Sequence, residues 1–396
     1  MSDTQKNKKP NVPNLRFPGF EGEWRDSTFG DCSTGFDYGM NAASKPFDGE
    51  HKYIRITDID ENTSEYKEYG VVSPDTEIDE LYRVKENDIL FARTGASTGK
   101  TYLYTPKDGQ LYFAGFLIRM NVLPQNDSRF VFYQTQTPRY KKWVQIMSMR
   151  SGQPGINSQE YSSFRCFLPK LEEQQRIADL LTLIDQRIST QNKVIEDLKK
   201  LKTALCDRLY DETNPNCRIG EIIEQLSLRN RDDSTLNVLS VSNRYGFISQ
   251  TEQFEERSIA SEDTTNYKVV SLNDFAYNPA RINVGSIARN KSTEKGIVSP
   301  MYICFRCREV AFPEYLEQFF STKYFSLEVG KRVEGSVRLC LSFEGLCNIP
   351  ISLPSLTQQE SISGKINAVL RKIQLEENYL SVLSNQKQYL LSHLFI

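Results

Sequence analysis

The sequence predicts a mixed α/β fold that occurs twice in the chain, each copy followed by one long helix. The first reason is a repeat: the segment beginning at Leu168 aligns without a gap to the segment beginning at Leu353, at an offset of 185 residues. The second is a coiled-coil spacing of apolar residues in both segments, and the third is a shared order of charge and strand signals before them. Internal repeats of this kind define an architecture. We therefore expect two similar domains and two long helices that pair with each other.

The length and composition are those of an ordinary globular protein. The chain has 396 residues, of which 39% are hydrophobic and 25% charged, enough for two or three domains with their own cores. No apolar run is long enough to cross a bilayer, and the start "MSDTQKNKKPN" lacks the apolar core of a signal peptide. We expect a cytoplasmic protein that does not bind membranes, with a flexible arm at residues 1–14.

The first domain is expected at residues 15–167. Its first part, 15–90, contains 8 Lys/Arg and 18 Asp/Glu, whereas 91–167 contains 10 and 3. The pair Asn87-Asp88 before an apolar run predicts a strand entered from a tight turn. A glycine-containing loop, a second strand in "LYFAGFLIRMNV" and a helix rich in aromatic residues follow.

The first long helix is expected within residues 168–211. Pro169 suits a helix entry, and Pro215 in "DETNPNC" cannot continue a helix. Its seam steps by four and three residues alternately, as in a coiled coil. The seam comprises Ile177, Leu181, Ile184, Ile188, Gln191, Ile195, Leu198, Lys202, Leu205 and Leu209.

The second domain (212–352) and the second helix (353–396) repeat this order. Asn273-Asp274 again precedes an apolar run, and 212–274 is acidic (6 Lys/Arg, 11 Asp/Glu) before a basic part at 275–352 (10 and 7). The second seam comprises Ile362, Ile366, Val369, Ile373, Glu376, Leu380, Leu383, Lys387, Leu390 and Leu394. Since length and polar breaks match, the two helices are expected to pair with each other as a coiled coil.

The loop "RTGASTGKT" resembles a nucleotide-binding loop but does not meet its requirements. A Walker loop needs four residues between its first glycine and Gly-Lys-Thr, and Gly95 to Gly99 leaves three. The matching loop of the second copy has Gly285 followed by Ser286. Cys304 and Cys307 form a CxxC without a second pair or a nearby histidine, so buried thiols are favoured over zinc. We find no catalytic, metal or cofactor site and expect a protein that is not itself an enzyme.

Both loops carry side chains suited to nucleic acids. Arginine and asparagine can read guanine and adenine edges, and lysine, serine and threonine suit phosphates. Solvated surface loops are the alternative interpretation. The DNA-binding candidates are Arg93, Thr94, Ser97, Lys100, Lys141, Lys142, Arg150, Gln153, Arg281, Asn283, Arg289, Arg332, Ser336 and Arg338.

The chain resembles the specificity (S) subunit of type I restriction-modification complexes. The resemblance rests on the duplicated plan, the helix entry "LPKLEEQQRIADLLTLID", the N-terminal "LRFPGFEGEW" and the turn "SGQPGINSQEY". It implies two target recognition domains that each read one half of a split double-stranded DNA sequence. The resemblance further implies that the two long helices lie antiparallel as a coiled coil, which holds the domains apart and relates the two copies by a pseudo-twofold axis. It also implies two modification (methyltransferase) subunits that use S-adenosylmethionine, and restriction subunits that supply ATP- and Mg²⁺-dependent translocation and cleavage. All these cofactors are expected on the partners and none on this chain.

A scaffold without sequence-specific DNA binding is the main alternative. In that reading the paired helices dock partner proteins and the domains bind peptides. Apolar residues outside the seam (Leu180, Leu183, Val194 and Leu201) indicate partner subunits in either case.

Overall fold

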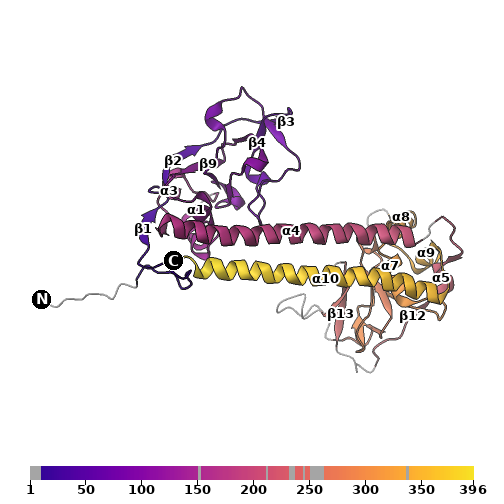
Figure 1. Ribbon diagram of the computed structural model, residues 1–396. Coiled ribbons are helices and arrows are strands. Elements are labelled where there is room, and N and C mark those ends of the chain that lie inside the picture. Colours follow the sequence, from indigo (N-terminus) through magenta and orange to yellow (C-terminus); the bar gives the residue numbers. More distant parts are fainter. Residues whose placement is uncertain are drawn as a thin grey trace. The chain divides into compact units, whose positions relative to one another are not determined.

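The computed structural model describes residues 10–149, 153–210, 213–231, 237–243, 246–249, 263–335 and 339–396. The chain forms two compact units, one of residues Met1–Asn192 with Asn378–Ile396, the other of Lys193–Glu377. Each unit contains one α/β domain with the adjoining parts of both long helices, α4 (Leu171–Leu209) and α10 (Leu356–His393), which are labelled in Figure 1. Within the described ranges, no helix combines the length and apolar character needed to cross a membrane.

The main sheet of the first unit has four antiparallel strands in the order β2-β9-β6-β7. Beside it, β4 pairs in parallel with β8, and the pairs β1-β10 and β3-β5 are antiparallel. The strands are β1 (Arg25–Thr28), β2 (Ser33–Tyr38), β3 (Ser44–Pro46), β4 (Lys52–Ile54), β5 (Val72–Pro74), β6 (Asp88–Ala92), β7 (Thr101–Leu103), β8 (Leu111–Phe113), β9 (Leu117–Val122) and β10 (Arg165–Leu168). The helices are α1 (Ser128–Gln134), α2 (Pro138–Met147) and α3 (Ser158–Ser162).

The second unit repeats this topology. Its main antiparallel sheet has the order β12-β19-β16-β17, β13 pairs in parallel with β18, and β11 pairs antiparallel with β20. The strands are β11 (Cys217–Arg218), β12 (Ile223–Leu226), β13 (Val238–Ser242), β14 (Gly246–Ser249), β15 (Lys268–Val270), β16 (Phe275–Tyr277), β17 (Ile287–Arg289), β18 (Gly296–Val298), β19 (Ile303–Cys307) and β20 (Pro350–Ile351). The helices are α5 (Ile219–Ile222), α7 (Pro313–Phe319), α8 (Lys323–Gly330) and α9 (Phe343–Cys347).

The predicted turn before the central strand is confirmed in both units. Asn87 and Asn273 have φ of 69° and 68°, a left-handed conformation that asparagine tolerates better than most residues. The next residue closes the turn, since the Asp88 carboxylate accepts from the Lys85 amide at 2.8 Å and the Asp274 carboxylate from the Ser271 amide at 2.8 Å. Burial raises the pKa of Asp88 and of Asp274 because it disfavours the charged form. The hydrogen bonds from Lys85 and Ser271 oppose this effect by stabilising the carboxylates.

A buried glutamine in the first turn of each long helix joins that helix to its own domain. The side chain of Gln174 accepts from the Asp127 amide at 3.0 Å and donates to the Pro169 carbonyl at 3.0 Å. Gln359, 185 residues later, accepts from the Phe312 amide at 2.7 Å and donates to the Pro354 carbonyl at 2.8 Å. This repeated clasp is the structural reason for the Gln identity in the sequence repeat.

The predicted seam is buried, and the two helices run antiparallel within each unit. In the first unit Ile177, Leu181 and Ile184 of α4 share one core with Leu390 and Leu394 of α10. That core also contains Trp24, Phe130 and Tyr161 of the domain. The seam lysine of α10 also contacts α4 in this unit, where Lys387 Nζ lies 2.6 Å from the Asp185 carboxylate.

The second unit pairs the opposite ends of the helices. Cys206 and Leu209 near the end of α4 pack with Ile362 and Ile366 near the start of α10. An ion pair of 2.7 Å between Lys199 and Glu377 lies further along the same pairing. The predicted fold class, a duplicated mixed α/β fold with paired long helices, is therefore confirmed.

The two cysteines of the CxxC pair are buried or partly buried thiols of one strand. Cys304 is fully buried and Cys307 is partly buried in β19, and burial raises the pKa of each thiol to about 12. Among the residues that the structure describes, no three His, Cys, Asp or Glu side chains gather as a metal site.

Candidate nucleic-acid interface

The glycine loop of the first unit joins β6 to β7 at the edge of the main sheet. Its middle, Gly95–Ser97, is a 3-10 turn (η3), and Thr98 fastens the turn by donating its hydroxyl to the Gly95 carbonyl at 2.7 Å. Gly95 has φ of 74° and Gly99 of 89°, and a Cβ at Gly99 would lie 2.5 Å from the Val144 side chain. The glycines are therefore required by backbone conformation and close packing.

A second segment joins this loop from a distance in the sequence. The Gly95 amide donates to the Pro154 carbonyl at 2.9 Å, and the Ile156 amide donates to the Arg93 carbonyl at 2.9 Å. Thr94 forms a bridge with Gly155. The structure thus brings Gln153, which is exposed, beside Arg93 and Thr94, as the candidate set requires.

Arg93 stacks on an aromatic side chain that the sequence analysis missed. Its guanidinium carbon lies 5.0 Å from the ring centroid of Tyr38 at the end of β2. The Tyr38 hydroxyl accepts from the Ser158 amide at 3.3 Å, and hydrogen bonding with the side chain and then the backbone of Ser158 lowers the pKa of Tyr38. Phe116, 58% exposed, accepts the Arg93 amide through its carbonyl. A planar cation on an aromatic face beside a polar loop is suited to stacking on and hydrogen-bonding with bases.

Several amides of this loop donate to acceptors within the protein. Besides Gly95, the Thr98 amide donates to Gly95, the Gly99 amide to Ala92 and to the Tyr161 hydroxyl, and the Lys100 amide to Ser97. A phosphate-cradling loop must direct such groups at the ligand. The local geometry therefore argues against a Walker-type phosphate site.

The remaining candidates of the first unit differ in their exposure and in their ion pairing. Lys100 Nζ lies 2.5 Å from the Glu61 carboxylate, and this pairing lowers the pKa of Glu61. Lys141 and Lys142 are exposed on α2. Ser97 is partly buried in the turn, and Arg150 lies outside the described residues.

The matching loop of the second unit joins β16 to β17. Its middle is the 3-10 turn Ile282–Val284 (η5), which ends at Gly285 with φ of 84°. Arg281 and Asn283 are both exposed at this tip. The Leu341 amide donates to the Pro279 carbonyl just as Ile156 donates to Arg93, so Pro279 takes the place of Arg93 in the second fold. The frame is shared, but the polar side chains sit at different positions in it.

Two arginine candidates of the second unit serve the fold. Arg289 is 9% exposed and pairs with Glu314 at 3.1 Å and Glu317 at 3.0 Å, while also donating to Asn273 at 2.6 Å. Arg332 pairs with the buried Glu328. Because their charges are already neutralised within the fold, we expect Arg289 and Arg332 not to read bases. Ser336 and Arg338 lie outside the described residues.

Replacing Arg289 by methionine is expected to destabilise the second unit by about 2 kcal/mol, because Glu314 loses its arginine partner and Glu317 keeps only its ion pair with Lys291 at a partly exposed site. Urea unfolding followed by circular dichroism measures this change. Sequence preference in DNA binding should remain. A variant that folds normally but loses that preference would return Arg289 to the base-reading set.

Comparisons with known proteins agree with this architecture. Residues 39–200 match the family model "Type I restriction modification DNA specificity domain". The type I restriction enzyme MjaVIII specificity subunit of Methanocaldococcus jannaschii is 23% identical over 365 residues, covering 83% of each chain. The type I restriction enzyme HindI specificity subunit of Haemophilus influenzae is 26% identical over 168 residues, covering 40% of this chain and 35% of the relative.

Solved structures share the whole fold. The S subunit of a type I restriction-modification system from M. genitalium superposes with a TM-score of 0.61 at 14% identity, covering 97% of this chain and 99% of that one. A chain from a study of complex assembly and conformational transition of the type I R-M system gives 0.56 at 16%, covering 96% and 98%. These matches show that residues 39–200 are similar to the type I restriction modification DNA specificity domain, and that the whole chain has the fold of solved type I restriction-modification S subunits.

Proposed function

We propose that this chain is the non-catalytic DNA-reading subunit of a type I restriction-modification complex, with one domain for each half of a split double-stranded target. The observation that carries the proposal is the repeated loop frame with different side chains at its tip: Arg93 and Gln153 in the first unit, Arg281 and Asn283 in the second. A shared frame with different polar tips is what two readers of different sequences require.

The proposal includes the partner subunits. Two methyltransferase subunits would supply S-adenosylmethionine, and restriction subunits would supply ATP, Mg²⁺ and cleavage. Leu183 and Leu201 of α4 are 58% and 47% exposed, and exposed apolar residues on a paired helix support a partner surface. This chain would position those enzymes and hold no cofactor itself.

The decisive experiment is co-expression with the modification subunit, followed by mapping of methylated adenines in genomic DNA by single-molecule sequencing. We expect a motif of two short halves with an unread centre. Exchanging residues 212–352 for those of a relative should alter one half only. A complex that assembles but methylates no motif would favour the scaffold alternative.

Lys141→Ala and Lys142→Ala are each expected to weaken binding to specific and random DNA equally. Exposed lysines that meet only phosphates carry no sequence information, and each contact adds about one unit to the slope of log affinity against log salt. Titrations at several salt concentrations on both DNAs measure this. A loss confined to the recognised sequence would assign the lysine to base reading instead.

A further inference from the structure

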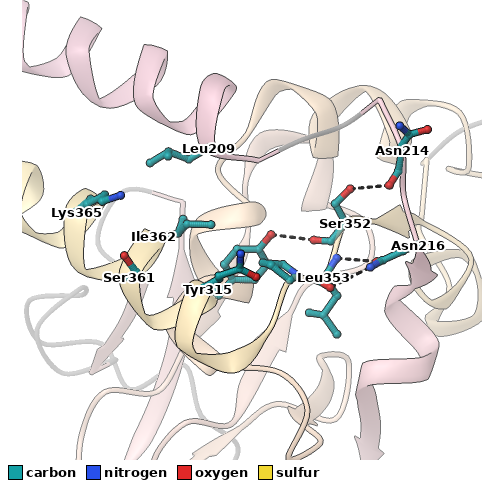
Figure 2. A pocket seen from close by; sticks show the side chains of 11 residues that line it. Leu209, Asn214, Asn216, Tyr315, Ser352, Leu353, Ser361, Ile362 and Lys365 are labelled. Atoms are coloured by element: carbon teal, nitrogen blue, oxygen red, sulfur yellow. Dashed lines mark hydrogen bonds between the residues drawn. The ribbon is translucent and has the colours of Figure 1, made fainter.

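A pocket of about 430 Å³ opens in the second unit where α4 ends and α10 begins. Its apolar lining includes Leu209, Tyr315 and Ile362, and its polar lining includes Gln358, Ser361 and Lys365. Figure 2 shows Lys365 and Ser361 at one end, with Asn214 and Asn216 at the other. The DNA-reading candidates of this unit do not line the pocket.

The equivalent place in the first unit is filled by the chain itself. The clasp glutamines Gln174 and Gln359 are equivalent, so Glu173 is the counterpart of Gln358. Glu173 is 2% exposed and receives two bonds of 2.8 Å from Arg16. Arg16 belongs to an N-terminal segment, residues 10–24, which we call the strap.

Other strap residues complete this filling. The Leu15 amide donates to the His393 carbonyl at 2.9 Å, and Phe17 packs against the core. The Trp24 ring lies edge-on to Phe130 at 5.8 Å, and its Nε1 donates to Glu173 at 3.3 Å. Phe130 is the counterpart of Tyr315 at the offset of 185.

One position of this filled site holds a much smaller residue in the second unit. The register of β1 with β10 matches that of β11 with β20, since Ser27 faces Cys166 as Cys217 faces Ile351. Three residues earlier, Trp24 therefore corresponds to Asn214. The exchange of tryptophan for asparagine leaves the pocket open where the strap lies in the first unit.

The pocket also differs in charge from the strap site. Gln358 replaces the carboxylate of Glu173, and Lys365 replaces Leu180. Gln358 accepts from Ser355 through Oε1, which directs its amide nitrogen to act as a donor. None of the described lining residues is acidic, so the pocket offers an ammonium and an amide donor to an occupant. Such donors suit a carboxylate.

We propose that this pocket docks an extended peptide segment of a partner chain, one that presents a large apolar side chain and a carboxylate. The apolar side chain would lie against Tyr315 and Ile362, as Phe17 and Trp24 fill the first site, and the carboxylate would face Lys365. A second copy of this chain is a poor occupant, because its strap presents Arg16 to a lysine. The proposal does not depend on DNA reading.

Binding is tested with the full chain and a fluorescent peptide of residues 12–20 that carries Arg16→Glu. Anisotropy should give a Kd below about 1 mM, about tenfold tighter than for the unaltered peptide. Lys365→Glu should reverse this preference, and Asn214→Trp should abolish binding by restoring the filling residue. Lys372→Glu, an exposed lysine two turns further along α10, is the matched control and should leave both affinities unchanged.

Photocrosslinking locates the bound peptide. With benzoylphenylalanine in place of Phe17 in the probe, mass spectrometry should find adducts on the pocket lining, at Leu209, at Tyr315 or within residues 353–365. Equal binding of both peptides, no binding up to about 1 mM, insensitivity to Lys365→Glu, or adducts elsewhere would each overturn the proposal. Since Lys365 is exposed, its variant remains informative even if Asn214→Trp fails to fold.

Discussion

Arg93→Ala is expected to lower affinity for the recognised DNA roughly tenfold to one-hundredfold, with a much smaller loss on random DNA. The guanidinium rests on Tyr38, which reduces the conformational entropy lost when it binds two acceptors of a base. Tyr38→Ala should give a smaller loss of the same kind, whereas Tyr38→Phe keeps the ring and should retain most of the affinity. Competition titrations with specific and random duplexes measure all three variants.

The controls separate base reading from general charge. Arg165→Ala removes an exposed arginine of the same unit that pairs with Asp26, and both affinities should change little. Arg281 belongs to the second unit. Arg281→Ala should therefore reduce discrimination between bases only in the half-site that the second unit reads. If Arg93→Ala weakens both DNAs equally, Arg93 contacts phosphate and the base-reading role is wrong.

Gln174→Leu and Gln359→Leu are each expected to destabilise their own unit by about 2–4 kcal/mol. Leucine fills a similar volume but leaves buried backbone groups without partners: the Asp127 amide and Pro169 carbonyl in one unit, the Phe312 amide and Pro354 carbonyl in the other. Each buried group that loses its partner costs about 1–3 kcal/mol.

Urea unfolding with hydrogen exchange of each unit measures the effect. Gln175→Leu is the matched control, since Gln175 is the exposed neighbour on the same helix and should change stability by less than about 0.5 kcal/mol. Equal stability of Gln174→Leu and Gln175→Leu would show that the clasp contributes nothing.

The repeat and the helix seams could be predicted because their signals are local. A helix brings residues three and four apart onto one face, so the periodicity shows which side of α4 and α10 is buried. The turn at Asn87 and Asn273 could be predicted for the same reason, because asparagine tolerates positive φ by itself. These features need no knowledge of distant segments.

The role of each polar loop residue could not be predicted in this way. Arg289 and Arg281 look alike as basic loop residues, but Arg289 meets Glu314 and Glu317, which stand 25 and 28 residues later in the chain. Arg93 acquires its platform from Tyr38, 55 residues earlier. Tyr38 ends β2 and Arg93 follows β6. Only the sheet order, which places these strands on either side of β9, brings the two residues together.

The sequence by itself determined the duplicated α/β plan, the two long helices with their seams, and the family resemblance. The tertiary structure decided which charges are neutralised within the fold, which cations remain exposed at the loop tips, and that the strap fills one helix junction while the other stays open. The physical reason is range. Periodicity and turn chemistry act between neighbours in the chain, whereas burial and ion pairing depend on segments that only the folded topology brings together.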